Sequence, residues 1–272
     1  MVVLGASGLA RSAVVILVAA ACALGAQAPS ASANGLTLTV LYDNNPFDPR
    51  LTTADGFSVL IEGLQRRILF DTGGSGAILL RNMGLLSIDP RQIDIVVLSH
   101  IHNDHVGGLA GLLGQAGSVR VYVLSSFPLE FKQRVRQAGA DVVEVSGPTE
   151  ITDGAHSTGE LGVAIKEQAL VLKTAAGLVV ITGCAHPGVV NMVARAQAAL
   201  GGEVRLVMGG FHQRGMKADV ILEVIARLKA QGVRQVGPGH CSGDLSRRLF
   251  REAYGEDFIE IGVGRVLRLA DG

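Results

Sequence analysis

Six of the seven histidines in this chain stand at or just after the end of a short apolar run. In α/β proteins, polar side chains that follow strands enter loops, and those loops are where functional sites are assembled. We therefore expect an α/β fold whose site is built from several strand ends. The runs and the polar residues that follow them are 68–70 with Asp71, 93–99 with His100, 178–183 with Cys184 and His186, 204–210 with His212, and 233–239 with His240.

The apolar periodicity after residue 35 predicts strands and helices along the whole remaining chain. Tryptophan is absent and aromatic residues make up 4% of the chain, so the core must consist mainly of Val, Leu, Ile and Ala, which suits buried strands. The expected strands are 36–42, 57–62, 67–70, 93–99, 119–124, 169–174, 178–182, 204–208 and 258–269. The expected helices are 76–83, 109–115, 129–138, 189–199, 218–231 and 246–254.

The segment 100–105, His-Ile-His-Asn-Asp-His, is the most specific feature of the sequence. Alternate residues of an extended segment point the same way, so His100 and His102 can bind one metal ion. After a turn, Asp104 and His105 can bind a second ion at the roughly 3.5–4 Å spacing of dinuclear sites. Imidazole and carboxylate ligands suit zinc, with iron and manganese as alternatives. A solvated histidine-rich loop without metal is the other interpretation.

The first 33 residues resemble an export signal. Arg11 is the only charged residue before Asp43, the apolar run 12–24 is short for a membrane span, and two small-x-small sites end at residues 28 and 33. We expect a signal peptide over 1–33, cleaved after Ala33, and one catalytic domain over 34–272 in a periplasmic or secreted protein without a transmembrane span. An uncleaved N-terminal anchor and a lipoprotein attached through Cys22 are the alternatives.

The charge composition points to a small-molecule substrate. The chain has 24 basic and 24 acidic residues and no basic cluster, so a nucleic-acid-binding surface is not expected. Nothing in the pattern decides the oligomeric state.

The segment 100–109 resembles the signature of the metallo-β-lactamase superfamily, HxHxDH followed by Gly-Gly and Leu. Within that superfamily the chain resembles the branch of dihydropterin-ribofuranosylaminobenzene phosphate synthase-like proteins. The resemblance implies an α/β fold, a four-layer αββα sandwich, with two divalent metal ions at one edge. The motifs that carry it are LYDNN at 41–45, GFSVLIE at 56–62, ILFDTG at 68–73, TGE at 158–160, EQAL at 167–170, VVITGCAHPGVVN at 179–191, GGFH at 209–212 and GHC at 239–241.

The same resemblance implies the remaining ligands. His186 would complete the first metal's ligand set and His240 would be the distal ligand of the second, while Cys184 would take the place of a bridging aspartate. A disulfide between Cys184 and Cys241 is the alternative use of that cysteine. Asp71 would accept a hydrogen bond from a ligand histidine and orient it.

Two residues are candidates for catalysis itself. Asp104 would bind metal and orient the nucleophile. His212 would face the substrate and stabilise negative charge or protonate a leaving group. The alternative is that His212 is the third ligand of a metal ion.

These residues predict an exported metal-dependent hydrolase, in which a metal-bound hydroxide attacks a small-molecule ester, phosphoester or lactone-like bond. The alternative is a metal-dependent synthase or transferase that acts on a phosphorylated pterin-like substrate. A third possibility is a non-catalytic metal-binding or ligand-binding protein of the envelope, against which the intact HxHxDH segment argues.

Overall fold

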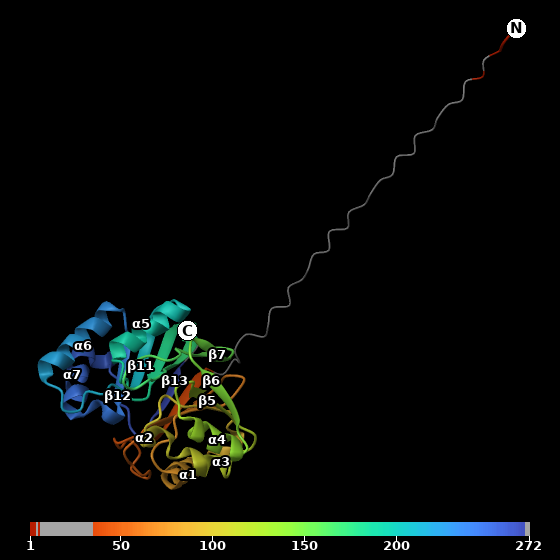
Figure 1. Ribbon diagram of the computed structural model, residues 1–272. Coiled ribbons are helices and arrows are strands. Elements are labelled where there is room, and N and C mark those ends of the chain that lie inside the picture. Colours follow the sequence, from red (N-terminus) through yellow and green to blue (C-terminus); the bar gives the residue numbers. More distant parts are fainter. Residues whose placement is uncertain (4, 6–34, 270–272) are drawn as a thin grey trace. The chain divides into compact units, whose positions relative to one another are not determined.

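The computed structural model of this protein describes residues 1–3, 5 and 35–269 (Figure 1). The chain divides into the units Met1–Ser30 and Ala31–Gly272, and all helices and strands below belong to the second unit. Most of the expected signal peptide, including Cys22 and both small-x-small sites, lies outside the described residues. Export therefore stays a prediction. In the described ranges, no helix has the length and apolar character needed to cross a membrane.

Two β-sheets form the centre of the second unit. The first sheet has the order β13 (Val266–Leu269), β1 (Leu36–Tyr42), β2 (Ser58–Glu62), β3 (Ile68–Phe70), β4 (Ile95–Val97), β5 (Arg120–Leu124) and β6 (Asp141–Val145). The second has the order β12 (Gln235–Gly239), β11 (Val204–Gly210), β10 (Gly177–Thr182), β9 (Leu170–Thr174), β8 (Ala155–Ser157) and β7 (Thr149–Thr152). Both sheets mix parallel and antiparallel pairs.

The strand β10 shows why the two sheets pack inside helices. Val179 and Ile181 belong to the apolar cluster that joins the two sheets, whereas Leu178 and Val180 belong to the cluster shared with the helices. Because successive side chains point to opposite faces, a strand that is buried on both faces has a continuous apolar sequence. This explains the uninterrupted run 178–181 and confirms the predicted four-layer sandwich.

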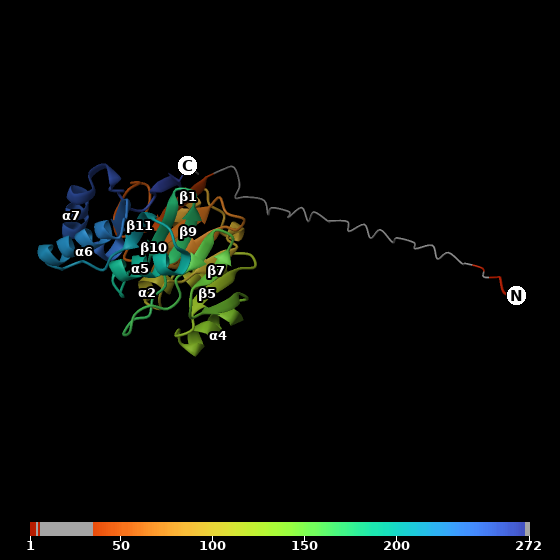
Figure 2. The same ribbon diagram turned by 90° about the horizontal axis from the view of Figure 1, so that it is seen from above.

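Helices cover the outer face of each sheet (Figures 1 and 2). The first sheet is covered by α1 (Gly76–Leu85), α3 (Leu109–Leu113) and α4 (Leu129–Gln137), and the second by α5 (Val189–Leu200), α6 (Ala218–Ala230) and α7 (Asp244–Tyr254). The short helix α2 (Asn103–Val106) follows β4 and was not predicted, because four residues leave no apolar periodicity.

The expected strand 258–269 is wrong over most of its length. Only β13, Val266–Leu269, is a strand, and Phe258 and Val263 make isolated bridges to Val236 and Pro46. Glycine interrupts the segment at 262 and at 264, where φ is +92°. The short strands β6, β7 and β8 were not predicted, because none of them has the regular apolar alternation that marks a half-buried strand.

The carboxyl ends of parallel strands bring the site residues together. β3 and β4 are parallel neighbours in one sheet, as are β10, β11 and β12 in the other. The two sets of strand ends approach each other closely at Gly183, where a Cβ atom would lie 2.1 Å from the Ser99 hydroxyl. Glycine is therefore required at position 183 for the loops after β4 and β10 to meet.

Candidate metal centre

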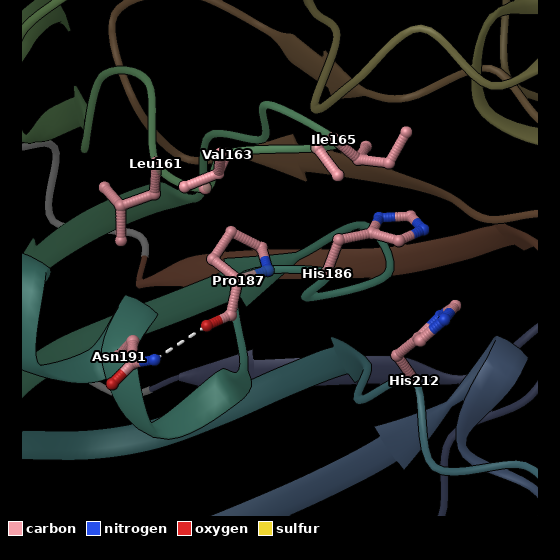
Figure 3. Close-up of a pocket in the computed structure, with 9 residues that line it drawn as sticks. Leu161, Val163, Ile165, His186, Pro187, Asn191 and His212 are labelled. Carbon is pink, nitrogen blue, oxygen red and sulfur yellow. Dashed lines mark hydrogen bonds between the residues drawn. The ribbon is translucent and has the colours of Figure 1, made fainter.

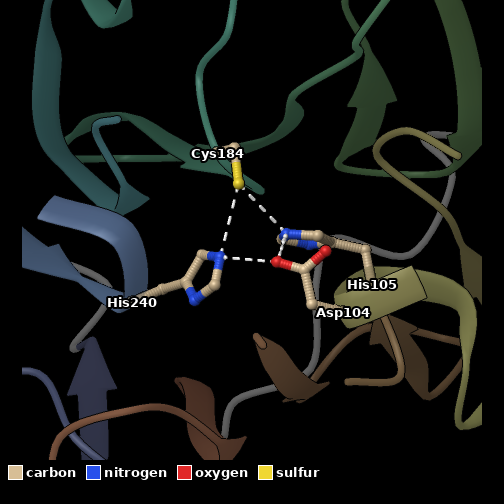
Figure 4. A group of neighbouring side chains, drawn as sticks. All are labelled: Asp104, His105, Cys184 and His240. Atoms are coloured by element: carbon tan, nitrogen blue, oxygen red, sulfur yellow. Dashed lines mark hydrogen bonds and ion pairs between the residues drawn. The ribbon is translucent and has the colours of Figure 1, made fainter. Parts of the chain in front are cut away.

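Asp104, His105, Cys184 and His240 form the first group of convergent donors (Figure 4). The Cys184 Sγ atom lies 3.2 Å from His105 Nε2 and 3.3 Å from His240 Nε2. Asp104 Oδ2 lies 3.4 Å and 3.2 Å from the same two nitrogens. Carboxylate, thiol and imidazole donors in one cluster are a ligand set that binds transition metals. This group can hold one cation.

His100, Cys184 and His186 form a second group, so Cys184 belongs to both. The rings of His100 and His186 have centroids 4.6 Å apart. The ring of His102 lies 4.7 Å from that of His100 and 4.9 Å from that of His186. His102 thus lies beside this group, although its donor atoms are not part of a mutually close set. Cys184 is common to the two groups, and the bridging role that the resemblance implies for it stays a prediction.

The His100 imidazole fits a metal ligand. It is fully buried, its Nδ1 lies 2.9 Å from the Ser99 hydroxyl, and its Nε2 has no hydrogen-bond partner among the described residues. Burial lowers the pKa of His100 to about 2, so this imidazole is neutral at physiological pH. A buried nitrogen without a partner is costly unless something binds it, and a cation would use its lone pair.

Asp71, which follows β3, positions two of the three histidines of the loop after β4. Its Oδ2 lies 2.7 Å from His105 Nδ1, and its carboxylate also accepts hydrogen bonds of 2.7 Å from the Ser99 backbone N–H and hydroxyl. Burial alone would lower the pKa of His105, but Asp71 and Asp104 outweigh it and raise that pKa to about 10. Asp71 therefore orients His105 directly and His100 through Ser99.

Asn44 and Asp43 position His240, and neither was assigned a role from the sequence. Asn44 Oδ1 lies 2.7 Å from His240 Nδ1, and the Asp43 carboxylate accepts from the His240 backbone N–H at 2.9 Å. The first contact directs Nε2 towards Cys184. Both residues belong to the LYDNN motif, which was recognised in the sequence. Their role was not, because their partner His240 lies almost 200 residues further along the chain.

Glu167 positions the loop that carries Cys184 and His186, and it was also not assigned a role. Its fully buried carboxylate accepts from the backbone N–H groups of residues 183, 184, 185 and 186 at 2.8–3.1 Å. It also lies 2.9 Å from His186 Nδ1. Burial would raise the pKa of Glu167, but these hydrogen bonds, that of His186 first, lower it to about 2. The carboxylate is thus ionised at neutral pH, and it fixes the loop.

Cys241 and His212 lie at the side of the second group and, with Cys184, form a third close set. Cys184 and Cys241 are both free thiols, so the alternative of a disulfide between them is wrong. A hydrogen bond with Cys241, and then burial, raise the pKa of the Cys184 thiol. Binding a cation at Cys184 therefore requires displacement of its proton. His212 is exposed, with its ring 4.4 Å from that of His186.

Backbone strain is concentrated at this centre. Asp71, Ala185, His212 and His240 have φ values between +41° and +60°, and among the described residues only Ser87 adds another non-glycine with positive φ. Each such conformation costs about 1–3 kcal/mol and persists where the surrounding structure enforces it. The loops after β3, β10, β11 and β12 therefore hold their side chains against a backbone preference.

Comparisons with known proteins agree with this geometry. A family model described as the Metallo-beta-lactamase superfamily matches residues 51–185, a range that contains the segment 100–105 and Cys184. The curated relative 7,8-dihydropterin-6-methyl-4-(beta-D-ribofuranosyl)-aminobenzene-5'-phosphate synthase of Methanocaldococcus jannaschii is 29% identical, over 83% of this chain and 92% of its own length.

Solved structures resemble the chain as well. One, described as a metal-dependent hydrolase of the beta-lactamase superfamily, is 27% identical with a TM-score of 0.73, covering 87% of this chain and 100% of its own. The metallo-beta-lactamase fold protein YhfI from Bacillus subtilis is 15% identical with a TM-score of 0.65, covering 86% of this chain and 99% of its own, and it shares the fold.

Proposed function

Because this chain belongs to the metallo-beta-lactamase superfamily, we propose that it is a metal-dependent synthase that acts on a phosphorylated, pterin-like small molecule. The relative that is a synthase matches the chain over most of both lengths and supports bond formation ahead of hydrolysis. Export of the mature chain stays a prediction of the sequence.

The observation that carries the proposal is the place of Cys184 in both donor groups. We infer that Asp104, His105 and His240 would hold one cation and His100, His102 and His186 a second, with Cys184 available to either. Imidazole, thiolate and carboxylate donors favour zinc, and iron is the alternative. When bound, such cations stabilise negative charge on a phosphoryl or carbonyl oxygen and acidify water.

The chain's own residues prepare the centre for this chemistry. Asp71, Asn44 and Glu167 each form a hydrogen bond with the Nδ1 atom of a histidine. The Nε2 atoms of His105, His240 and His186 are thereby left to bind metal. His212 is exposed beside His186, and its hydrogen bond with Cys241 raises its pKa. His212 can therefore donate a proton to a leaving oxygen, in line with the role expected from the sequence.

One experiment tests the synthase proposal. Metal-loaded protein is incubated with a 7,8-dihydropterin whose 6-methyl substituent carries a phosphate leaving group, together with a 5'-phosphorylated ribofuranosylaminobenzene. Mass spectrometry should detect a product that joins the two molecules, and the His105→Ala variant should not form it. If metal-loaded protein forms no joined product under conditions in which both substrates remain intact, the synthase proposal is wrong.

Hydrolysis is the second candidate, and the solved hydrolase structure favours it. In the same incubation, a hydrolase would release the hydroxymethyl pterin and phosphate without a joined product. Phosphodiester, lactone and thioester probes would extend the test to other bonds. Turnover of one of these probes, lost on metal removal, would assign the hydrolytic function.

The ligand assignment predicts the metal content of two histidine variants. His102→Ala and His240→Ala should each contain fewer metal ions per chain than the wild type, because each removes one donor from a different set. Elemental analysis after dialysis against a weak chelator measures this. His156→Ala is a matched control, since His156 lies on β8 outside the donor groups. If both variants keep the full wild-type metal content, the assignment is wrong.

A further inference from the structure

A cavity of about 530 Å³ lies beside the second donor group. Its walls are the segment 161–165, Pro187 and Asn191, and it ends at the imidazoles of His186 and His212. Figure 3 shows Leu161, Val163 and Ile165 on one side of the cavity and Pro187 with Asn191 on the other, with both imidazoles at one end. A group bound here would therefore be next to the reacting centre.

The lining of this cavity selects against charge. Its residues are apolar except for the two imidazoles and Asn191, and no carboxylate, guanidinium or ammonium group is among them. The Asn191 side-chain N–H donates to the Pro187 carbonyl at 2.7 Å, so this amide braces the wall. Away from the two imidazoles, an ionic group in this cavity would lose hydration without gaining a partner, whereas an apolar group gains from burial.

The segment Leu161–Glu167, which we call the pocket hairpin, has a defined shape. Leu161 and Glu167 exchange two backbone hydrogen bonds of 2.9 Å, and Gly162 has φ of +95°. At the tip, Val163 is 96% exposed. Glu167 at the base also holds the loop of Cys184 and His186 through its carboxylate. Glu167 therefore connects the pocket wall with the donor groups. At the tip of the hairpin, the exposed apolar side chain of Val163 lines the cavity.

We propose that the pocket hairpin forms a subsite for an uncharged planar ring system of the substrate, with Val163 and Ile165 as the residues that determine specificity. The volume suits a group of one or two rings, since binding cavities for small molecules are about 300–1,000 Å³. The ring would lie between the hairpin and Pro187, with its reactive substituent directed to His186 and His212. The inference rests on the proposed function only for that last orientation.

The test uses the neutral fluorescent amine N-phenyl-1-naphthylamine as a probe of metal-loaded protein. We expect saturable binding to the wild type, at least tenfold weaker binding to Val163→Asp, and binding within twofold of the wild type for Val163→Leu. Leu129→Asp is the matched control, because Leu129 is 62% exposed on α4 and does not line the cavity. Absence of saturable binding, or equal loss in Val163→Asp and Leu129→Asp, overturns the subsite.

This measurement separates the subsite from the proposed function. Probe binding that depends on Val163, in a protein that catalyses neither reaction above, supports the subsite and contradicts the enzymatic proposal. Turnover together with probe binding that is unchanged in Val163→Asp supports the enzymatic proposal and contradicts the subsite.

Discussion

The Cys184→Ala variant should lose metal from both donor groups and with it nearly all activity. Cys184 is the one residue common to the two groups in the described part of the chain, so its removal weakens both sets, whereas loss of a histidine weakens one. We expect the loss of activity to exceed the roughly 10- to 100-fold typical of removing an outer partner of a ligand. Metals per chain and turnover, measured on the same preparations, test this.

Two further variants test whether Cys184→Ala loses metal because Cys184 bridges the two donor groups. Cys184→Asp restores an anionic donor of similar reach, so it should regain metal content above that of Cys184→Ala. Cys241→Ala removes the neighbouring thiol, which belongs to neither main group, and should keep its metal content. If Cys184→Ala retained full metal, or if Cys241→Ala lost as much, a bridging role for Cys184 would be excluded.

The elements that could be predicted from the sequence are those whose pattern reflects burial on both faces. The run 178–181 is apolar throughout because each face of β10 is covered, and the predicted strand matches the observed one within a residue. By contrast, β7 and β8 have polar sequences and exist because they pair with each other and β8 with β9. Such pairing depends on tertiary neighbours, which a local pattern does not reveal.

The same distinction applies to the site. The segment 100–105 is local in sequence, so its donors could be proposed from spacing alone. The role of Asn44 could not, because its partner His240 lies 196 residues further along the chain. Glu167 stands in a motif that was recognised by resemblance, but its function arises only where β9 and β10 bring it under the loop 183–186. Asn44 and Glu167, which hold candidate ligands in place, were therefore harder to predict than the ligands, whereas the resemblance had already assigned such a role to Asp71.

Glu167→Ala should strongly destabilise the folded protein. The substitution leaves four backbone N–H groups and the His186 ring N–H without their acceptor in a buried place. Each buried polar group without a partner costs about 1–3 kcal/mol, so we expect the free energy of unfolding to fall by about 4 kcal/mol or more. Since proteins are stable by only about 5–15 kcal/mol, denaturant unfolding should show a large shift.

The matched control is Glu160→Ala. The Glu160 carboxylate lies in the same region and accepts one backbone N–H, that of Ser126, at 2.7 Å. Its loss should cost about 1 kcal/mol, as for an ordinary hydrogen bond. Equal destabilisation by the two substitutions would contradict the role assigned to Glu167.

The isosteric variant Glu167→Gln separates folding from metal binding. Its amide keeps one acceptor oxygen but places an NH₂ group against N–H donors, so the loop of Cys184 and His186 should shift while the chain still folds. Glu167 contacts two members of the second donor group, Cys184 through its backbone N–H and His186 through its ring, but only the shared Cys184 of the first group. The second donor group should therefore lose affinity first. Chelator titration should then remove one metal ion from Glu167→Gln well before the other, and simultaneous release of both, as from the wild type, would show that Glu167 does not act through His186.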